Sequence, residues 1–173
     1  MGWQREIDES PEAVKQALAP LRNGISVAVV SLGNAFAAGA IIRVCHSFLV
    51  RDIVLIGDAP YYPKASMGMH KYEEIVRVAD DEAFLRYVGE RPLIALEGER
   101  AQGNFYLEPS FPGDAVFLFG SERFGIPASL LARADRVLGL PMYGINHSFP
   151  VAVAAGMVLG EWARRRYAPG TLV

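Results

Sequence analysis

The alternation of short apolar runs with segments of helical spacing is the feature that most constrains the fold of this chain. Residues Ile25–Leu32, ISVAVVSL, form a nearly continuous apolar run rich in β-branched side chains. Such a run is typical of a strand covered on both faces. After Gly33-Asn34, apolar side chains between Ala38 and Leu49 recur at helical spacing and form one stripe. The alternation therefore begins with a buried strand followed by an amphipathic helix.

The same alternation continues toward the C-terminus. Further strands are predicted at Asp52–Ile56, Ile75–Val78, Leu93–Leu96, Ala115–Phe119 and Val137–Leu140, and further helices at Pro11–Leu18, Asp81–Val88, Ala128–Arg133 and Val151–Arg165. Apolar strands separated by helices are typical of a parallel sheet. We therefore predict an α/β fold, a mostly parallel sheet with helices on both faces. The 173 residues are expected to form a single domain (1–173), with residues 1–23 as a short N-terminal helical extension.

Composition and charge narrow the classes of function. The net charge of -2 gives no support for autonomous nucleic-acid binding, which usually needs a basic excess. The one dense basic run, Arg164–Arg166, is expected to be the solvated end of the last helix. Cys45 is the only cysteine, which excludes an intrachain disulfide and indicates a reduced thiol in a cytoplasmic protein. No apolar stretch approaches the roughly 18–20 residues that a membrane span needs.

The loops that follow the strands are the candidate sites, since ligands of such sheets bind beyond the carboxyl ends of the strands. These loops are 33–37, 98–103, 120–125 and the turn after Leu140. Gly120 and Gly125 permit positive φ and close approach of a ligand to the backbone, and Glu122 between them can face a cation or a hydroxyl. A plain strand-to-helix turn is the alternative, with Glu122 near a helix start. Neither a P-loop nor a Gly-x-Gly-x-x-Gly pattern is present.

A second polar segment joins the last strand to the last helix. Pro141 ends the strand, and Ser148 and Pro150 are predicted as the cap and a first-turn residue of the helix. A serine-hydrolase site at His147-Ser148 is excluded because the two residues are adjacent and no Gly-x-Ser-x-Gly pattern exists. The histidines lack metal-site spacing and are interpreted as ordinary surface or core residues: His46, His70 and His147. No metal is expected.

Read together, these segments resemble the SpoU (TrmH-like) branch of the SPOUT superfamily of S-adenosylmethionine-dependent RNA methyltransferases. Phe119–Gly125 is similar to the second motif of that family, Gly-x-Glu-x-x-Gly. Leu140–Gly144 followed by Ser148 is similar to the third motif, and Gly39–Arg43 resembles the latter half of the first. The resemblance covers nearly the whole chain, and three ordered motifs make it specific.

The resemblance implies a C-terminal deep trefoil knot, formed as the last helix passes through the preceding loops, and a homodimer with the knot region at its interface. It also implies S-adenosyl-L-methionine as cofactor, bent within the knot and held mainly by backbone groups. The cofactor-binding positions that match the family are Leu96, Glu97, Gly120, Leu140, Met142, Ser148 and Val151.

For the reaction, the resemblance implies 2′-O-ribose methylation of tRNA or rRNA. Arg43, Glu122 and Ser148 are the residues assigned to the catalytic site. A guanidinium stays protonated, so Arg43 is expected to stabilise an RNA phosphate or the developing alkoxide. The alternative for Arg43 is a surface arginine in a salt bridge. The RNA-binding candidates are Arg43, Lys64, Lys71 and Arg123.

Two departures from the family pattern keep a second hypothesis open. The family has an asparagine two residues before the position of Gly39 and another in the third motif, and these positions hold Ala37 and Pro150. Asn34 and Asn146 are candidates to compensate. A catalytically inactive knotted cofactor- or RNA-binding homologue is therefore the second hypothesis, and an unrelated doubly wound nucleotide-binding domain is the third. The sequence identifies neither the RNA nor the nucleotide.

Overall fold

The computed structural model describes residues 9–30 and 33–166. The strands are β1 (Ser26–Val30), β2 (Ile53–Ile56), β3 (Ile75–Val78), β4 (Leu93–Leu96), β5 (Gly103–Asn104), β6 (Val116–Phe119) and β7 (Arg136–Gly139). The α-helices are α1 (Pro11–Leu18), α2 (Ala35–Ser47), α3 (Asp81–Val88), α4 (Ala128–Arg133) and α5 (Val151–Arg166). Short 3₁₀ helices are η1 (Ala19–Leu21), η2 (Pro63–Ser66), η3 (Met69–Lys71) and η4 (Phe105–Leu107).

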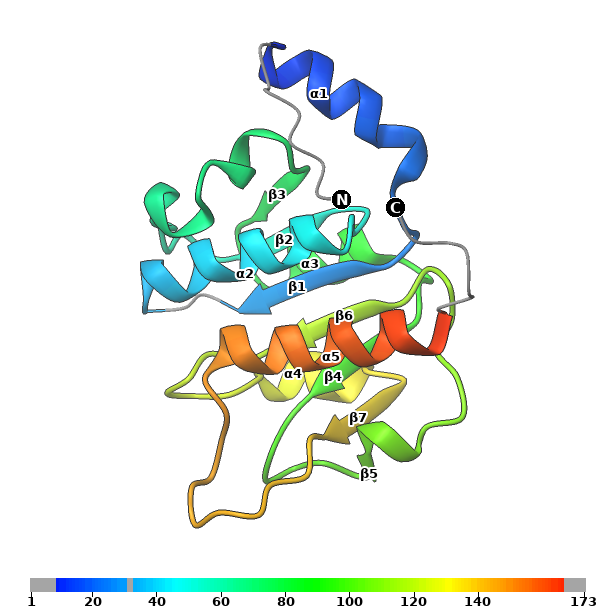
Figure 1. The fold of residues 1–173 in the computed structure, drawn as a ribbon. Helices are drawn as coiled ribbons and strands as arrows, with labels where there is room; N and C mark the ends of the chain where they lie inside the picture. Colours follow the sequence, from blue (N-terminus) through cyan, green and yellow to red (C-terminus); the bar gives the residue numbers. More distant parts are fainter. Residues whose placement is uncertain (1–8, 31–32, 167–173) are drawn as a thin grey trace.

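The strands form one parallel sheet in the order β3-β2-β1-β6-β4-β7-β5. Some strands that are neighbours in the sheet are far apart in the sequence. Strand β6 lies between β1 and β4, and β7 lies between β4 and β5 (Figure 1). The predicted α/β fold with a parallel sheet is confirmed.

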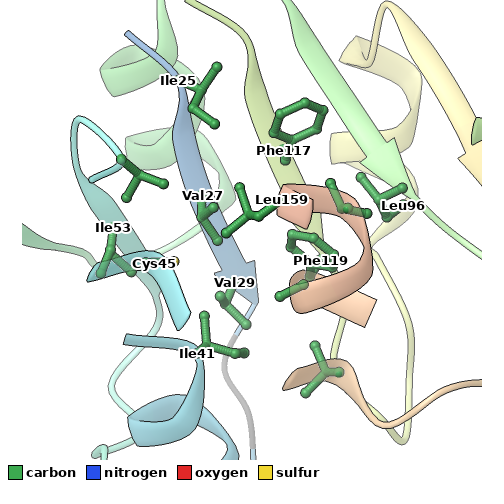
Figure 2. Packing of buried hydrophobic residues seen from close by; sticks show 14 of the residues in the cluster. Ile25, Val27, Val29, Ile41, Cys45, Ile53, Leu96, Phe117, Phe119 and Leu159 are labelled. Atoms are coloured by element: carbon green, nitrogen blue, oxygen red, sulfur yellow. The ribbon is translucent and has the colours of Figure 1, made fainter. Parts of the chain in front are cut away.

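Helices cover both faces of the sheet, as predicted. Helices α2 and α5 lie against one face and α3 and α4 against the other (Figure 1). On the first face, Ile41 and Cys45 of α2 and Leu159 of α5 pack over alternate residues of β1 and β6, among them Val27 and Phe117 (Figure 2). Since alternate strand residues point to opposite faces, a strand apolar throughout is buried on both sides.

Helices α1, α2 and α3 each begin with a side-chain cap, whereas α4 does not. The Ser10 hydroxyl accepts from the Ala13 amide (3.2 Å), as predicted for α1. Helix α5 begins at Val151, and the Val153 and Ala154 amides donate to the carbonyl of Pro150. The prediction of Ser148 as the cap is therefore wrong. Its side chain lies three residues before the first helical residue, whereas a capping side chain belongs to the residue that adjoins the helix.

The segment from β4 to β5 crosses the carboxyl end of β7. The Glu97 amide donates to the Leu138 carbonyl (3.0 Å), and the Gln102 amide donates to the Val137 carbonyl (2.8 Å). A Cβ on Gly139 would lie 3.3 Å from the Glu97 carbonyl oxygen, so the two backbones are in close contact. The chain that leaves β7 therefore runs past this segment before it reaches α5.

The end of α5 is more buried than the sequence suggested. The Arg165 guanidinium donates to the backbone carbonyls of Phe105, Tyr106 and Glu108. It also pairs with Glu161 (2.7 Å). The interpretation of Arg164–Arg166 as a solvated helix end is thus wrong for Arg165, because the β5–β6 connection folds back against the helix. In the part of the chain that the structure describes, no helix is long and apolar enough to cross a membrane.

Candidate active site

A cavity of about 460 Å³ lies at the carboxyl ends of β4, β6 and β7. This volume is within the range of small-molecule sites, roughly 300–1,000 Å³. Three of the four loops singled out in the sequence form its walls, together with the first turn of α5. No residue of the fourth, 33–37, lines the cavity, and residues 35–37 form the start of α2. The lining residues are Leu96, Glu97, Gly98, Glu99, Arg100, Phe119, Gly120, Ser121, Glu122, Arg123, Phe124, Gly125, Leu140, Met142, His147, Ser148, Phe149, Val151 and Ala154.

The turn after β6 is held by its own backbone. The Ser121 amide donates to the Gly125 carbonyl (3.1 Å), and the Gly125 amide donates back to the Ser121 carbonyl (2.9 Å). Gly125 has φ of 66°, a conformation that favours glycine. A Cβ on Gly120 would lie 2.3 Å from the carbonyl carbon of Gly125, so no larger residue fits there. The backbone of this turn is thus exposed to the cavity in a fixed conformation.

Glu97 joins two walls of the cavity. Its Oε2 accepts from the Ile126 amide (3.2 Å) and from Arg100 (2.9 Å), and its Oε1 accepts from the Gly98 amide (3.2 Å). Arg100 also donates to the Ile126 carbonyl (2.9 Å). The loop after β4 is therefore bonded to the loop after β6. Sequence reasoning missed Arg100, although its position three residues after Glu97 is a spacing at which opposite charges pair.

Every position predicted to bind the cofactor lines the cavity. The catalytic candidates Glu122 and Ser148 line it as well, and so does the RNA-binding candidate Arg123; the side chains of all three are exposed. His147, interpreted above as an ordinary surface or core residue, also lines it. The structure thus brings together residues from 96 to 154 that the motifs placed in separate segments.

Arg43, Lys64 and Lys71 do not line the cavity. Arg43 is exposed on α2, between two contacts that this helix makes with the η2–η3 segment. A Cβ on Gly39 would meet the Tyr62 carbonyl at 2.4 Å, and the His46 ring lies 6.1 Å from that of Tyr72. Residues at these spacings share one helix face, so Arg43 borders the segment that carries both lysines. Within residues 9–30 and 33–166 Arg43 forms no ion pair, which disfavours the salt-bridge alternative.

The two candidate compensating asparagines lie outside the cavity lining. The Asn34 side chain caps α2, accepting from the Phe36 and Ala37 amides (3.1 and 3.3 Å). Asn146 donates to the Ser148 carbonyl (3.2 Å) from an exposed position. Asn34 and Asn146 thus hold local backbone, the first at a helix start and the second in the loop before α5.

A buried charge cluster lies at the opposite edge of the sheet, where the chain enters β1 to β3. Glu73 is 3 % exposed and pairs with Arg22 (2.7 Å) and with His46 (2.7 Å). Arg22 also donates to the Val50 and Tyr72 carbonyls. Burial alone would raise the pKa of Glu73, but the hydrogen bonds from His46 and Arg22 outweigh it and lower that pKa below its ordinary value.

The remaining histidine, His70, is hydrogen-bonded to the buried Ser66 hydroxyl (2.7 Å). His46 and His70 therefore have structural partners, whereas His147 faces the cavity. Among the described residues, no group of three or more His, Cys, Asp or Glu side chains is placed to hold a metal ion.

The site fits the cofactor that the family uses. The inner walls are apolar, with buried Leu96, Phe119 and Val151, while the turn at Gly120–Gly125 offers backbone groups. A parallel sheet with β7 between β4 and β5, and a ligand-sized cavity at its carboxyl edge, fits the class of knotted α/β methyltransferases that the sequence resembles. Comparison with known proteins then specifies the family within this class.

A model described as the SpoU rRNA Methylase family matches residues 24–160, and the chain belongs to this family. It is 32 % identical over 137 residues to a protein of Thermus thermophilus named tRNA (guanosine(18)-2′-O)-methyltransferase, covering 76 % of this chain and 70 % of that relative.

Solved structures show the same fold. The TrmH/SpoU tRNA modifying enzyme of A. aeolicus has a TM-score of 0.79 at 23 % identity, covering 90 % of this chain and 82 % of that one. The SpoU methyltransferase AviRb of Streptomyces viridochromogenes, in complex with AdoMet, has a TM-score of 0.76 at 23 % identity, covering 87 % of this chain and 61 % of that one. The predicted SPOUT knot fold is confirmed, and an unrelated doubly wound nucleotide-binding domain is excluded.

Proposed function

We propose that this chain transfers the methyl group of S-adenosyl-L-methionine to a ribose 2′-hydroxyl of tRNA or rRNA. The observation that carries the proposal is the cavity at the carboxyl edge of the sheet, which every predicted cofactor-binding position lines. Membership of the SpoU family and the printed name of the Thermus thermophilus relative support the reaction class. The whole chain would act as one methyltransferase domain, with residues 1–23 as its N-terminal extension.

On the donor side, the chain binds and orients. Leu96, Leu140 and Val151 would form the apolar wall that excludes water, and the Gly120 backbone would supply polar contacts. When bound, the sulfonium of the cofactor supplies an activated methyl group, so the protein mainly aligns donor and acceptor. Glu122 and Ser148, both exposed at the cavity, would fix the donor and the loops around it.

On the acceptor side, Arg43 would stabilise the developing alkoxide or the adjacent phosphate, since its charge does not depend on pH near neutrality. Lys64 and Lys71 border the same face of α2 and would contact further phosphates. Arg123 would do so from the cavity itself. These basic side chains would provide local positive charge for RNA binding on a chain whose net charge is -2.

A homodimer would unite the two sides. Arg43 does not line the cavity of its own chain, so a second copy must bring its α2 to that cavity for the guanidinium to reach the acceptor. Phe36 of α2 and Val153 of α5 are large exposed apolar residues on two helices that pack on the same face of the sheet. Apolar side chains exposed in this way are common at interfaces between subunits.

The proposal is tested by methyl transfer to unmodified RNA. We expect labelled methyl groups from S-adenosylmethionine to appear as 2′-O-methylnucleosides, measured by mass spectrometry after digestion. Arg43→Ala should lower the rate by about 100-fold or more while calorimetry shows unchanged affinity for S-adenosylhomocysteine. If S-adenosylhomocysteine binds but no RNA pool is methylated, the inactive homologue is the correct reading.

Mixed dimers test whether the site is shared. Arg43→Ala keeps its cavity, whereas Ala154→Trp fills the cavity and keeps Arg43. If Arg43 acts on the second copy, mixing the two inactive variants should restore methyl transfer. Activity that stays absent in a mixture shown to contain mixed dimers would place Arg43 on its own chain's site.

A cytoplasmic location remains part of the proposal. It is supported by Cys45, whose thiol is fully buried against the sheet. Burial and the nearby Glu73 carboxylate raise the pKa of this thiol well above its ordinary value, which disfavours the reactive thiolate form.

A further inference from the structure

Phe124 is a large aromatic side chain at the cavity that is 78 % exposed. It belongs to the turn Ser121–Gly125, whose ends are bonded to each other by two backbone hydrogen bonds. The Phe124 amide also donates to the Ser121 hydroxyl (3.1 Å). The ring is therefore presented to solvent by a fixed turn.

Arg123 lies beside this ring. Its guanidinium carbon is 5.1 Å from the centroid of the Phe124 ring. In the part of the chain that the structure describes, the Arg123 guanidinium has no carboxylate partner. Aromatic rings and arginine guanidinium planes are the groups on which unpaired nucleobases stack. The turn therefore presents two planar groups of the kind that bind a base.

The position of Phe124 fits the acceptor better than the donor. The apolar residues that suit an enclosed ligand, Leu96, Phe119 and Val151, are buried at the inner wall. Phe124 lines the same cavity but keeps most of its ring in water. A nucleotide that enters the cavity from solvent can therefore contact this exposed ring.

We propose that Phe124, flanked by Arg123, is the stacking platform for the base of the nucleotide that is methylated. The inference rests on the proposed function, since it takes the acceptor to be an RNA nucleotide. The 2′-hydroxyl belongs to the sugar that carries the base, so stacking the base positions that hydroxyl. Because every base has a π-face, this contact holds the nucleotide without selecting its identity.

The test measures the affinity for a short unstructured RNA that contains 2-aminopurine. The fluorescence of 2-aminopurine reports binding, at saturating S-adenosylhomocysteine. Phe124→Ala and Phe124→Leu should each weaken binding by about 5- to 150-fold, whereas Phe124→Trp should retain it. Leucine keeps the apolar bulk but removes the π-face, so wild-type affinity in Phe124→Leu would overturn the proposal. Leu107→Ala is the matched control, because Leu107 is 79 % exposed on η4 outside the cavity lining.

Two further measurements test whether the methyl donor or a second copy of the chain contacts the Phe124 ring instead of a base. Calorimetry with S-adenosylhomocysteine should give the same affinity for Phe124→Ala as for wild type, and a loss there would assign the ring to the donor and overturn the proposal. Sedimentation should give the same mass for both proteins. A lower mass for the variant would mean that a second copy covers the ring, which also overturns it.

The outcomes distinguish a failure of the Phe124 platform from a failure of the proposed methyl transfer. If the wild type binds the RNA through Phe124 but methylates none, Phe124 still stacks a base, and both the methyl-transfer proposal and the assignment of that base to the methylated nucleotide fail. If the wild type methylates RNA and Phe124→Ala binds equally well, only the platform fails. If the wild type binds no RNA at all, both fail.

Discussion

The turn that forms one wall of the cavity has room only for glycine at position 120. A Cβ at this position would lie 2.3 Å from the Gly125 carbonyl carbon and 2.6 Å from the Ile126 amide nitrogen. Both are backbone atoms that cannot rotate away. We expect Gly120→Ala to abolish detectable S-adenosylhomocysteine binding in calorimetry and to lower the free energy of unfolding by about 1–3 kcal/mol in urea titrations.

Gly160 provides the control for that substitution. It lies within α5, and a Cβ there would meet no atom within 4 Å. Gly160→Ala should therefore be neutral for ligand binding and raise stability by about 0.5–1 kcal/mol, since alanine favours the helix. Wild-type ligand affinity in Gly120→Ala would contradict the close packing of the turn.

Residues inside a motif could be predicted from the sequence, whereas residues joined across loops could not. Gly120, Leu140 and Ser148 match family motifs and line the cavity as expected. Arg100 contributes because it reaches the Ile126 carbonyl, 26 residues away in the chain, and no local spacing encodes that contact. The position of Arg43 outside the cavity was equally hidden, because a motif does not say how its residues lie in space relative to those of the other motifs.

At the scale of elements, Arg165 fixes the end of α5 to the connection between β5 and β6. Its guanidinium donates to three backbone carbonyls and lies 4.9 Å from the centroid of the Phe111 ring. We expect Arg165→Ala to lower the free energy of unfolding by about 2 kcal/mol, because three backbone carbonyls, two of them in part-buried contacts, lose a charged donor. Urea titration followed by circular dichroism measures the change.

Arg164→Ala is the matched control on the same helix turn. Arg164 pairs with the same Glu161 but is largely exposed, and we expect no measurable loss of stability. Equal effects of the two substitutions would show that the ion pair with Glu161, and not the carbonyl contacts, holds the end of α5.

The elements with strong apolar patterns were predicted well. The bounds predicted for β3, α3, β4 and α4 agree with those observed. Strand β5, Gly103–Asn104, was not predicted, since it has two residues, no apolar pattern, and becomes a strand only by pairing with β7. The 3₁₀ helices η2 and η3 were also missed. Their residues likewise depend on contacts with a distant segment, in this case packing against α2.

At the scale of the whole molecule, Glu73 couples stability to pH. Folding lowers its pKa below the ordinary 4.5, so its stabilising contribution is present above about pH 4.5 and is lost as the pH falls through the lower pKa of the folded state. Glu73→Gln should lower the free energy of unfolding by about 3 kcal/mol at pH 7, because Arg22 is left buried without its counter-charge. The difference from wild type should shrink in titrations below pH 4.5.

The neighbouring Glu74→Gln serves as the control. Glu74 is exposed and pairs with Lys15 across the surface (2.5 Å), so its loss should change stability by less than about 1 kcal/mol. A Glu73→Gln difference that is constant from pH 7 to pH 3 would contradict the lowered pKa of Glu73.

The strand order has a consequence for how the protein is made. Strand β7 is synthesised last, yet its place is between β4 and β5, both of which are synthesised earlier. Because β5 joins the sheet through β7, it cannot pair before β7 has been made, so the sheet cannot be completed in the order of translation. The cavity is lined by residues that precede β7 in the chain and by residues that follow it, from Leu96 to Ala154. Only molecules in which β7 has taken its place in the sheet can therefore bind the ligand. Affinity for the methyl donor is thus a measure of whether the knotted fold has formed correctly.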